Sequence, residues 1–281
     1  MAISYINKNA TAGKATSLTG VTAGNLIVAM IQYSESTGIP TLSDGTNSPD
    51  AYSTKAGGVE WIRFAYWLSS PKSGTVTYTW TLADGEGHTA HVFEMSCSGV
   101  WALEHINAGD ASSGTVATST NETSSETSMV AFGGGGMNQA YAYSSATIDG
   151  SAVDQHASVV DGSFGSSGSL TMRVLNNPGT YNSAITFAGS GGWSADLIGF
   201  KETSSATIEQ EGFRFRNDDG SESTATWKAD QDVNITLAAT TAFRLRMILN
   251  ATGDPASIGA QLECRYKPSG GAFGSWAKVT S

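Results

Sequence analysis

The sequence predicts an all-β protein, either a sandwich or a barrel. Helical periodicity is almost absent over the 281 residues, whereas apolar and polar residues alternate with period 2 in many segments. Short apolar runs also end repeatedly at Gly, Ser, Asn or Asp, which are turn formers. Both observations are typical of many short strands joined by tight connections.

The expected strands of the leading part follow in chain order. Residues 26–33 (LIVAMIQY) are apolar on both faces, which predicts a central strand covered on both sides. Residues 75–82 (TVTYTWTL) alternate threonine with large apolar side chains. The remaining expected strands complete a set of about eight; they are VEWIRFAYWL (59–68), AHVFEMSCSGV (90–100), SMVAF (128–132), AITFAG (184–189) and ADLIGF (195–200).

A composition shift at KETSSATIEQEG (201–212) predicts a domain boundary near Ser204 and Ser205. Residues 1–203 would form the leading sandwich. Residues 204–281 have room for about six or seven short strands, which favours a small immunoglobulin-like β-sandwich over a jelly roll.

The trailing strands carry alternating basic residues. In EGFRFRNDDGSE, phenylalanine and arginine would face opposite sides, and NDDG predicts a turn. FRLRMIL (243–249) and LECRYK (262–267) repeat the arrangement, so one sheet would carry a basic row. This row contains Arg214, Arg216, Arg244, Arg246, Arg265 and Lys267. Two interpretations stay open: a solvated face on which arginines meet nearby acids, or a protein-docking surface, since Arg is enriched at interfaces.

Composition and charge restrict the class of function. Only 14% of the residues are Asp, Glu, Lys or Arg, so the surface is neutral and rich in hydroxyl groups, as in extracellular or virion β proteins. The net charge of −10 argues against a nucleic-acid partner. Most of it lies in residues 1–203, where 7 basic and 16 acidic residues give −9, whereas residues 204–281, with 8 and 9, give −1.

No membrane or secretion signal is expected. The opening residues lack the apolar core of a signal peptide, and no apolar run approaches the length of a membrane span. Cys97 and Cys264 are far apart in the chain and suit two core positions better than a disulfide.

The search for reactive groups gives no catalytic, cofactor or metal site. His88, His91 and Glu94 lie close in sequence, but the two histidines would face opposite sides of a strand, which disfavours zinc. The run Gly133–Gly136 lacks the Lys and Ser/Thr of a phosphate-binding loop and predicts a bulged or bent strand end.

Aromatic residues in loop-like segments leave a second kind of site open. Trp101, Tyr141, Tyr143 and Trp193 are candidates either for contact with a glycan or a partner or for simple anchoring.

Two segments resemble domains of phage proteins. The run from Ala23 to Val100 has an AGNL opening, an SDGTN turn leading to a tyrosine, a Thr-Val-Thr strand and a Glu-Met-Ser ending with Gly-Val. It resembles a jelly-roll-like domain of phage virion proteins and of some bacterial surface proteins, more loosely so beyond Val100. The motifs FRFRNDDGSE, TWKADQD and NATGDP resemble a small module of tailed-phage proteins. These motifs are turn and core residues and imply no catalytic role.

The resemblance implies a non-enzymatic structural protein of a tailed-bacteriophage virion, made in the host cytoplasm and exposed on the capsid exterior or on the tail. Its partners would be other virion proteins and, as a further option, a host-surface glycan, and it could form a homo-oligomer. The main alternative is a carbohydrate-binding module of a bacterial surface or secreted protein. A tailspike-like depolymerase ranks third, because no candidate acid pair stands out.

Overall fold

The computed structural model is all-β, as predicted, with antiparallel sheets throughout. It describes residues 3–34, 39–53, 56–57, 60–82, 88–106, 110–203, 207–221, 223–238, 241–252, 263–264 and 277–278. The chain forms two compact units, Met1–Thr203 and Ser204–Ser281. Each unit is described separately below.

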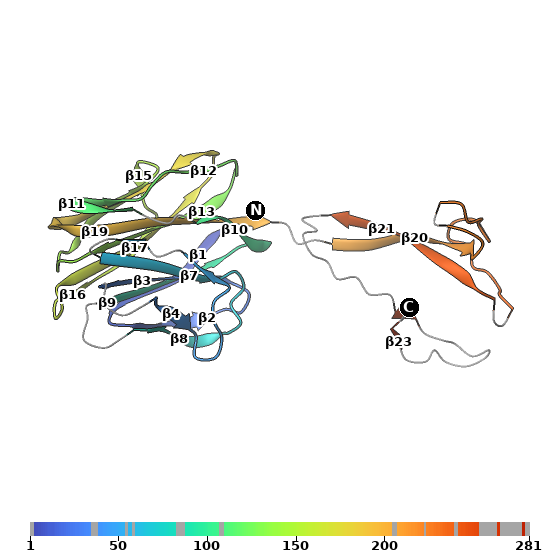
Figure 1. Cartoon of the computed structure of the whole chain (residues 1–281), viewed down its shortest axis with the longest axis horizontal. Coiled ribbons are helices and arrows are strands. Elements are labelled where there is room, and N and C mark those ends of the chain that lie inside the picture. The colour runs from blue at the N-terminus through green and yellow to red at the C-terminus, as the bar shows by residue number, and fades with distance from the viewer. Residues whose placement is uncertain are drawn as a thin grey trace. The chain divides into compact units, whose positions relative to one another are not determined.

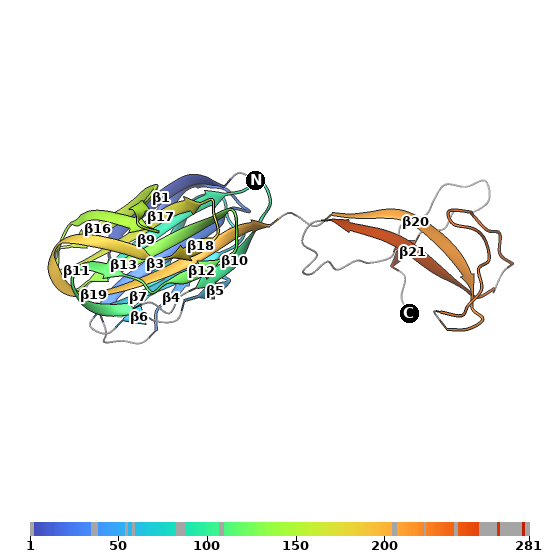
Figure 2. The same cartoon turned by 90° about the horizontal axis from the view of Figure 1, so that it is seen from above.

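The described residues of the leading unit form four sheets. Figures 1 and 2 show how their strands are arranged. The first sheet, in spatial order, consists of β1 (Ser4–Ala12), β9 (His88–Ser96), β3 (Leu26–Ser34), β7 (Glu60–Trp67) and β5 (Ala51–Tyr52), with β6 (Ala56–Gly57) also on β7. The second consists of β2 (Ala15–Val21), β8 (Gly74–Thr81) and β4 (Thr41–Ser43). The third consists of β15 (Ser151–Ala152), β14 (Tyr143–Ile148), β19 (Ser183–Thr203), β13 (Met129–Met137), β17 (Ser166–Leu175) and β16 (Gln155–Asp161), and β10 (Val100–Ile106) and β11 (Asp110–Thr118) also pair with β19. The fourth is the pair β12 (Glu122–Ser124) and β18 (Gly179–Tyr181).

The β3 sheet is the middle layer of the sandwich, and Figure 1 shows β3 between the β13–β17 and β4–β8 strands. Apolar side chains cover both of its faces. Alternate residues of β3 point to opposite sides. Val28 and Met30 pack toward the β13–β19 sheet, whereas Ile27 and Ile31 pack toward the β2–β8–β4 sheet. The sequence-based prediction of a central, doubly covered strand at 26–33 is therefore confirmed.

The β8 strand confirms the second pattern. Its buried residues are Val76, Tyr78 and Trp80, and the threonines between them are exposed. This strand therefore closes the outer side of the core with one apolar face and presents hydroxyl groups on the other.

The third sheet curls into a half-barrel around the long strand β19. The first part of β19 pairs with β14, and the last part pairs with β13 and β10. β11 follows β19 past the bend, where its partner jumps from Gly191 to Thr186. Two further apolar clusters fill the concave side, including Phe187, Trp193 and Tyr181.

The glycine run corrects one prediction. Gly133–Gly136 form part of the regular strand β13, whose register with β17 and β19 continues without a bulge. A Cβ atom at Gly134 would lie 2.6 Å from the sulfur of Met30, and one at Gly133 would lie 2.4 Å from Cβ of Ser183. The glycines are required because neighbouring layers approach both faces of β13, not because the chain bends there.

A buried polar group lies between the middle layer and the third sheet. The ring of His91 has Nδ1 3.0 Å from the carbonyl oxygen of Ala157 and Nε2 3.0 Å from the hydroxyl of Thr89. That hydroxyl lies 3.1 Å from the side-chain oxygen of Gln32. Because a carbonyl oxygen only accepts, Nδ1 must carry a proton. Gly168 leaves the space for this group, since its Cβ would lie 2.1 Å from Oγ1 of Thr89.

Buried carboxylates hold two of the sequence motifs in place, the SDGTN turn and the AGNL opening. Oδ1 of Asp44 accepts hydrogen bonds from the backbone N–H groups of Thr46 and Asn47, at 3.0 and 2.7 Å. Oε1 of Glu94 accepts one from the side chain of Asn25, at 2.7 Å. The AGNL opening and the Glu-Met-Ser ending are therefore in direct contact, which gives both motifs a structural role.

The trailing unit is described by two antiparallel pairs. β20 (Thr207–Asn217) pairs with β21 (Phe243–Thr252), and β22 (Glu263–Cys264) pairs with β23 (Ala277–Lys278). Figure 2 shows β20 and β21 as two long neighbouring ribbons. Many of the six or seven strands predicted for an immunoglobulin-like module would lie in residues outside the described ranges.

Candidate functional site

The β20–β21 pair brings four of the six predicted basic residues onto one face, called here the arginine face. Arg214 lies opposite Arg246, and Arg216 lies opposite Arg244. Side chains at such paired positions start about 5 Å apart, and like charges there destabilise a sheet. The basic row expected from the sequence is therefore real for these four residues. Arg265 and Lys267 lie outside the described residues.

The loop that follows β20 runs back along its free edge. The N–H groups of Asn217, Lys228 and Asp232 bond to the carbonyls of Thr226, Phe215 and Phe213, respectively. Asp219 fixes the turn by accepting from the N–H of Thr226 at 3.0 Å. The predicted NDDG turn is thus present, but its partner is this return segment (residues 226–232), not β21.

The return segment places Trp227 on the arginine face. Trp227 forms a bridge with Arg216, and the guanidinium carbons of Arg214 and Arg216 lie 4.2 and 4.7 Å from its ring centroid. Cation–π contacts of this kind stabilise the stacked groups. They also occupy ring surface that a sugar would need for stacking.

Arg216 corrects part of the predicted interface. Only 3% of its surface is exposed, and its guanidinium donates a 2.5 Å hydrogen bond to the carbonyl of Ala225. Its charge is thus used to hold the return segment, and it does not offer a surface to a partner.

The other three arginines differ in their local partners. Arg244 forms an ion pair with Asp218 at 2.8 Å. Arg214 donates to the carbonyl of Ala229 at 2.9 Å and reaches Asp230 at 3.4 Å, but the Asp230 side chain is 94% exposed, so this ion pair contributes little. Arg246 is exposed and has no acidic partner within the described part of the chain.

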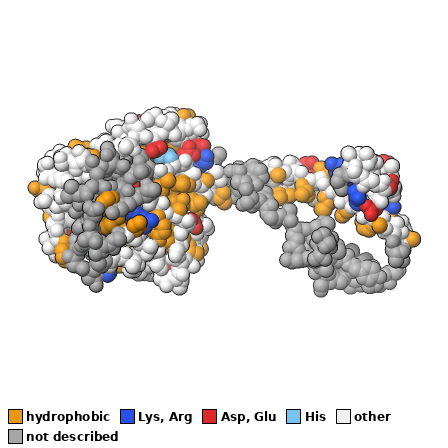
Figure 3. Space-filling view, in the orientation of Figure 1, with side chains coloured by type: hydrophobic (Ala, Val, Ile, Leu, Met, Phe, Trp, Pro, Cys, Tyr) orange, Lys and Arg blue, Asp and Glu red, His pale blue; other side chains and the backbone are white. Residues whose placement is uncertain are grey.

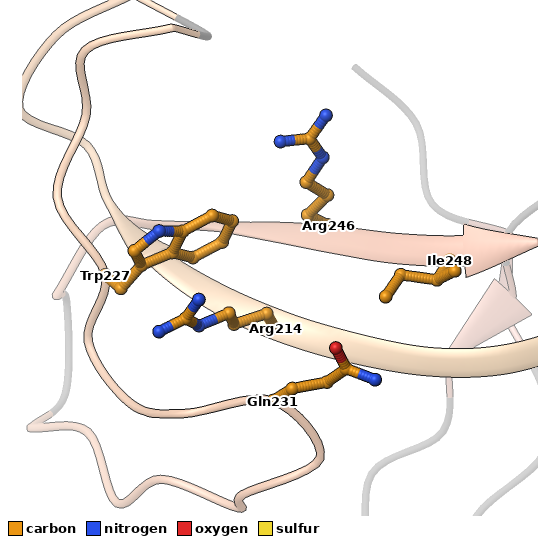
Figure 4. A pocket seen from close by; sticks show the side chains of 5 residues that line it. All are labelled: Arg214, Trp227, Gln231, Arg246 and Ile248. Atoms are coloured by element: carbon orange, nitrogen blue, oxygen red, sulfur yellow. The ribbon is translucent and has the colours of Figure 1, made fainter.

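A hollow of about 270 Å³ lies beside Arg214 and Arg246. It is lined by Arg214, Arg246, Trp227, Gln231 and Ile248. In Figure 4 the two arginines extend from neighbouring strands, with the indole beside Arg214. The hollow therefore combines two positive groups, an amide and an apolar wall, which is suitable chemistry for a carboxylate on an apolar stem.

The opposite face of the β20–β21 pair is apolar. Phe215 packs edge-on against Phe213 and Phe243, at 5.6 and 5.5 Å between ring centroids. Figure 3 shows hydrophobic side chains along this unit, with basic and acidic side chains close together. The predicted division into an apolar and a charged face is confirmed for β20 and β21.

The four aromatic candidates of the leading unit are placed differently. Trp101 and Trp193 lie in strands β10 and β19 and are buried in apolar clusters, so anchoring explains them and their rings are covered. Tyr141 packs closely against Gly189, and Tyr143 stacks on His156 at 4.3 Å. None of these rings forms an open platform for a sugar.

The three residues that were weighed as zinc ligands in the sequence are core residues of one strand. His88, His91 and Glu94 all lie buried in β9. Among the described residues, no group of three or more His, Cys, Asp or Glu side chains is arranged to hold a metal ion. The same residues include no helix long and apolar enough to cross a membrane.

Comparison of the chain with protein-family models, with curated proteins and with solved structures found no significant match.

Sequence reasoning missed three residues of the candidate site, Trp227, Gln231 and Ile248. The first two belong to the TWKADQD motif, which was interpreted only as a turn. The sequence did contain a signal for Trp227, because it follows the NDDG turn closely. A chain that reverses at this turn brings the tryptophan against the alternating arginines.

Proposed function

We propose that this protein is a non-enzymatic structural component of a tailed-bacteriophage virion, exposed on the capsid exterior or on the tail. It would be made in the host cytoplasm and bind other virion proteins through the arginine face of the trailing unit. The leading unit would act as a rigid layered body that displays or carries this face.

One observation carries the binding role. Two arginine pairs face each other across β20 and β21, an arrangement that lowers the stability of a sheet. Local contacts of Arg214, Arg216 and Arg244 offset part of this cost. Arg246 has no acidic partner among the described residues, and a residue that breaks a local rule without a local gain is typical of a functional site. An acidic surface on a partner would supply the missing negative charge, and Arg is enriched where proteins meet. The virion setting rests on the resemblance of the two sequence segments.

The test is the double variant Arg244→Ser/Arg246→Ser. We expect the wild-type chain to sediment with tailed particles in a density gradient of the native lysate. The double variant should be depleted from these particles without a lower melting temperature, because both residues lie at or near the surface and their removal relieves like-charge repulsion between the strands. Absence of the wild-type chain from particles, or normal incorporation of the variant, would contradict the proposal.

A glycan array on the same purified chain separates the main alternative. Binding to a defined glycan by a chain that does not associate with particles would replace the virion role with that of a carbohydrate-binding module.

A further inference from the structure

We propose that the hollow beside Arg214 and Arg246 binds the side-chain carboxylate of an acidic segment of a partner protein. This inference rests on the proposed function, because it specifies which part of the arginine face a protein partner contacts. The site is formed by strands β20 and β21 together with the return segment.

The first step in the argument is charge. Arg214 and Arg246 are direct cross-strand neighbours, so their guanidinium groups can reach one anion together. The next pair along the same face is different, because Arg244 is neutralised by Asp218 at 2.8 Å and Arg216 is buried. Among the described residues, positive charge without a firm counter-ion is therefore concentrated at Arg214 and Arg246.

The second step is geometry. A guanidinium group presents its N–H donors in a planar fork that matches the two oxygens of a carboxylate. Arg214 is held in place by its hydrogen bond to the carbonyl of Ala229 and by its contact with Trp227. Arg246 is exposed and can swing over the hollow. One arginine is thus preorganised and the other can close on the ligand. Asp230, almost fully exposed at 3.4 Å from Arg214, is a weak local competitor that a bound carboxylate would displace.

The third step identifies the class of ligand. Ile248 and the indole of Trp227 give the hollow an apolar wall, and Gln231 adds an amide that can donate or accept. The methylene groups of a glutamate and an apolar neighbouring residue would fit against that wall. A sugar acid fits less well, because Arg214 and Arg216 already lie within 5 Å of the indole centroid, at 4.2 and 4.7 Å.

The experiment is a titration of the full chain with the peptide acetyl-Ala-Glu-Ile-Glu-Ala-amide, followed by the NMR signals of the arginine Nε–H groups. The peptide with Gln in place of both Glu residues is the ligand control. We expect the acidic peptide to shift the signals of Arg214 and Arg246, and the Gln peptide to leave them unchanged.

The matched protein variants are Arg246→Gln and Arg244→Gln, which remove the same charge from alternate positions on one face of β21. Loss of a charge-assisted hydrogen bond should weaken peptide binding by about 10-fold or more in Arg246→Gln. Binding to Arg244→Gln should change by less than about 2-fold, since Arg244 is already paired with Asp218. Melting curves will verify that both variants are folded.

Three outcomes would overturn the inference. Equal losses in the two variants would mean that only net charge attracts the peptide. No shift with the acidic peptide at millimolar concentration would mean that the hollow does not bind carboxylates. Stronger binding of glucuronate than of the peptide would assign the hollow to a sugar acid. If the chain still sediments with particles, only this site is wrong; if the peptide binds but the chain does not sediment with particles, the proposed function is wrong.

Discussion

The buried histidine of the sandwich makes a prediction about acid stability. His91 is fully enclosed between two sheets, and burial lowers the pKa of its imidazole to about 3, although its hydrogen bond to the carbonyl of Ala157 opposes the shift. In the unfolded chain the same group has a pKa of about 6.5. A pKa that is lower in the folded state gives stability that is complete above the unfolded value and is lost as the pH falls through the folded one.

The size of the effect follows from these two values. Linkage predicts that His91 alone lowers the free energy of unfolding by about 2 kcal/mol between pH 7 and pH 5, and by about 3 kcal/mol at pH 4. Most carboxylates remain ionised down to pH 5, but Asp196, whose pKa is raised by burial, changes the stability in the same range with the opposite sign, so the contribution of His91 is obtained from the difference between the wild type and a His91 variant. His105 and His156 also have lowered pKa values, mainly through burial, and act in the same direction.

The assay is urea unfolding of the wild type and of His91→Asn at pH 7, 6 and 5. Asparagine keeps an N–H donor toward Ala157 and cannot gain a proton in this range. We expect the variant to be less stable at pH 7 but to lose about 2 kcal/mol less than the wild type on going to pH 5. Equal pH dependence of the two proteins would refute the reasoning. So would an NMR titration in which the ring signal of wild-type His91 moves near pH 6.5, a measurement that does not require the variant to fold.

Three further variants test the packing and the buried carboxyls. Gly134→Ala should lower the free energy of unfolding in urea by about 1–3 kcal/mol, because its Cβ would lie 2.6 Å from the sulfur of Met30. The control Gly162→Ala, whose Cβ would have nothing within 4 Å, should lower it by less than about 0.5 kcal/mol. Equal losses in the two variants would contradict the explanation that neighbouring layers approach β13 closely. Burial alone would raise the pKa of Asp44, but its hydrogen bonds lower the pKa to about 2. The free energy of unfolding of Asp44→Asn should therefore be about 2 kcal/mol lower than that of the wild type at pH 7, and this difference should shrink as the pH falls from 4 to 2. A difference that does not depend on pH would disprove the explanation. Burial raises the pKa of Asp196 well above its usual range. The free energy of unfolding of the wild type, relative to that of Asp196→Asn, should therefore fall as the pH rises from 4 to 7. An increase of this difference with pH would show that the carboxyl is ionised in the folded protein.

Local sequence pattern was sufficient where one strand determines the outcome. The alternation in residues 75–82 predicted which side chains of β8 are buried, and the continuous apolar run at 26–33 predicted a doubly covered strand. The same rule placed Arg214 and Arg216 on one face and Phe213 and Phe215 on the other. Period 2 is a property of the strand itself, so no knowledge of its neighbours is needed.

Features that depend on distant segments were not predictable in this way. The glycines of β13 depend on how closely neighbouring strands approach. Trp193 is buried because it packs in one apolar cluster with residues of β11, β13 and β14. Residues 184–189 and 195–200 were expected as two separate strands, yet β19 continues through the serine and glycine residues between them because β11 pairs with both of its halves. The role of Trp227 arises from a chain reversal that brings residues 226–232 back to β20.

The position of β19 has a mechanical consequence. This strand is the last one before the boundary between the two units, and its final residues are bonded on one side to β10 and on the other to β13. A pull on the trailing unit would act along the strand, at right angles to these hydrogen bonds. Many bonds would then bear the force at the same moment, rather than opening one after another from an end. Forced unfolding is governed by the unfolding rate, so this arrangement favours slow detachment of β19 under tension.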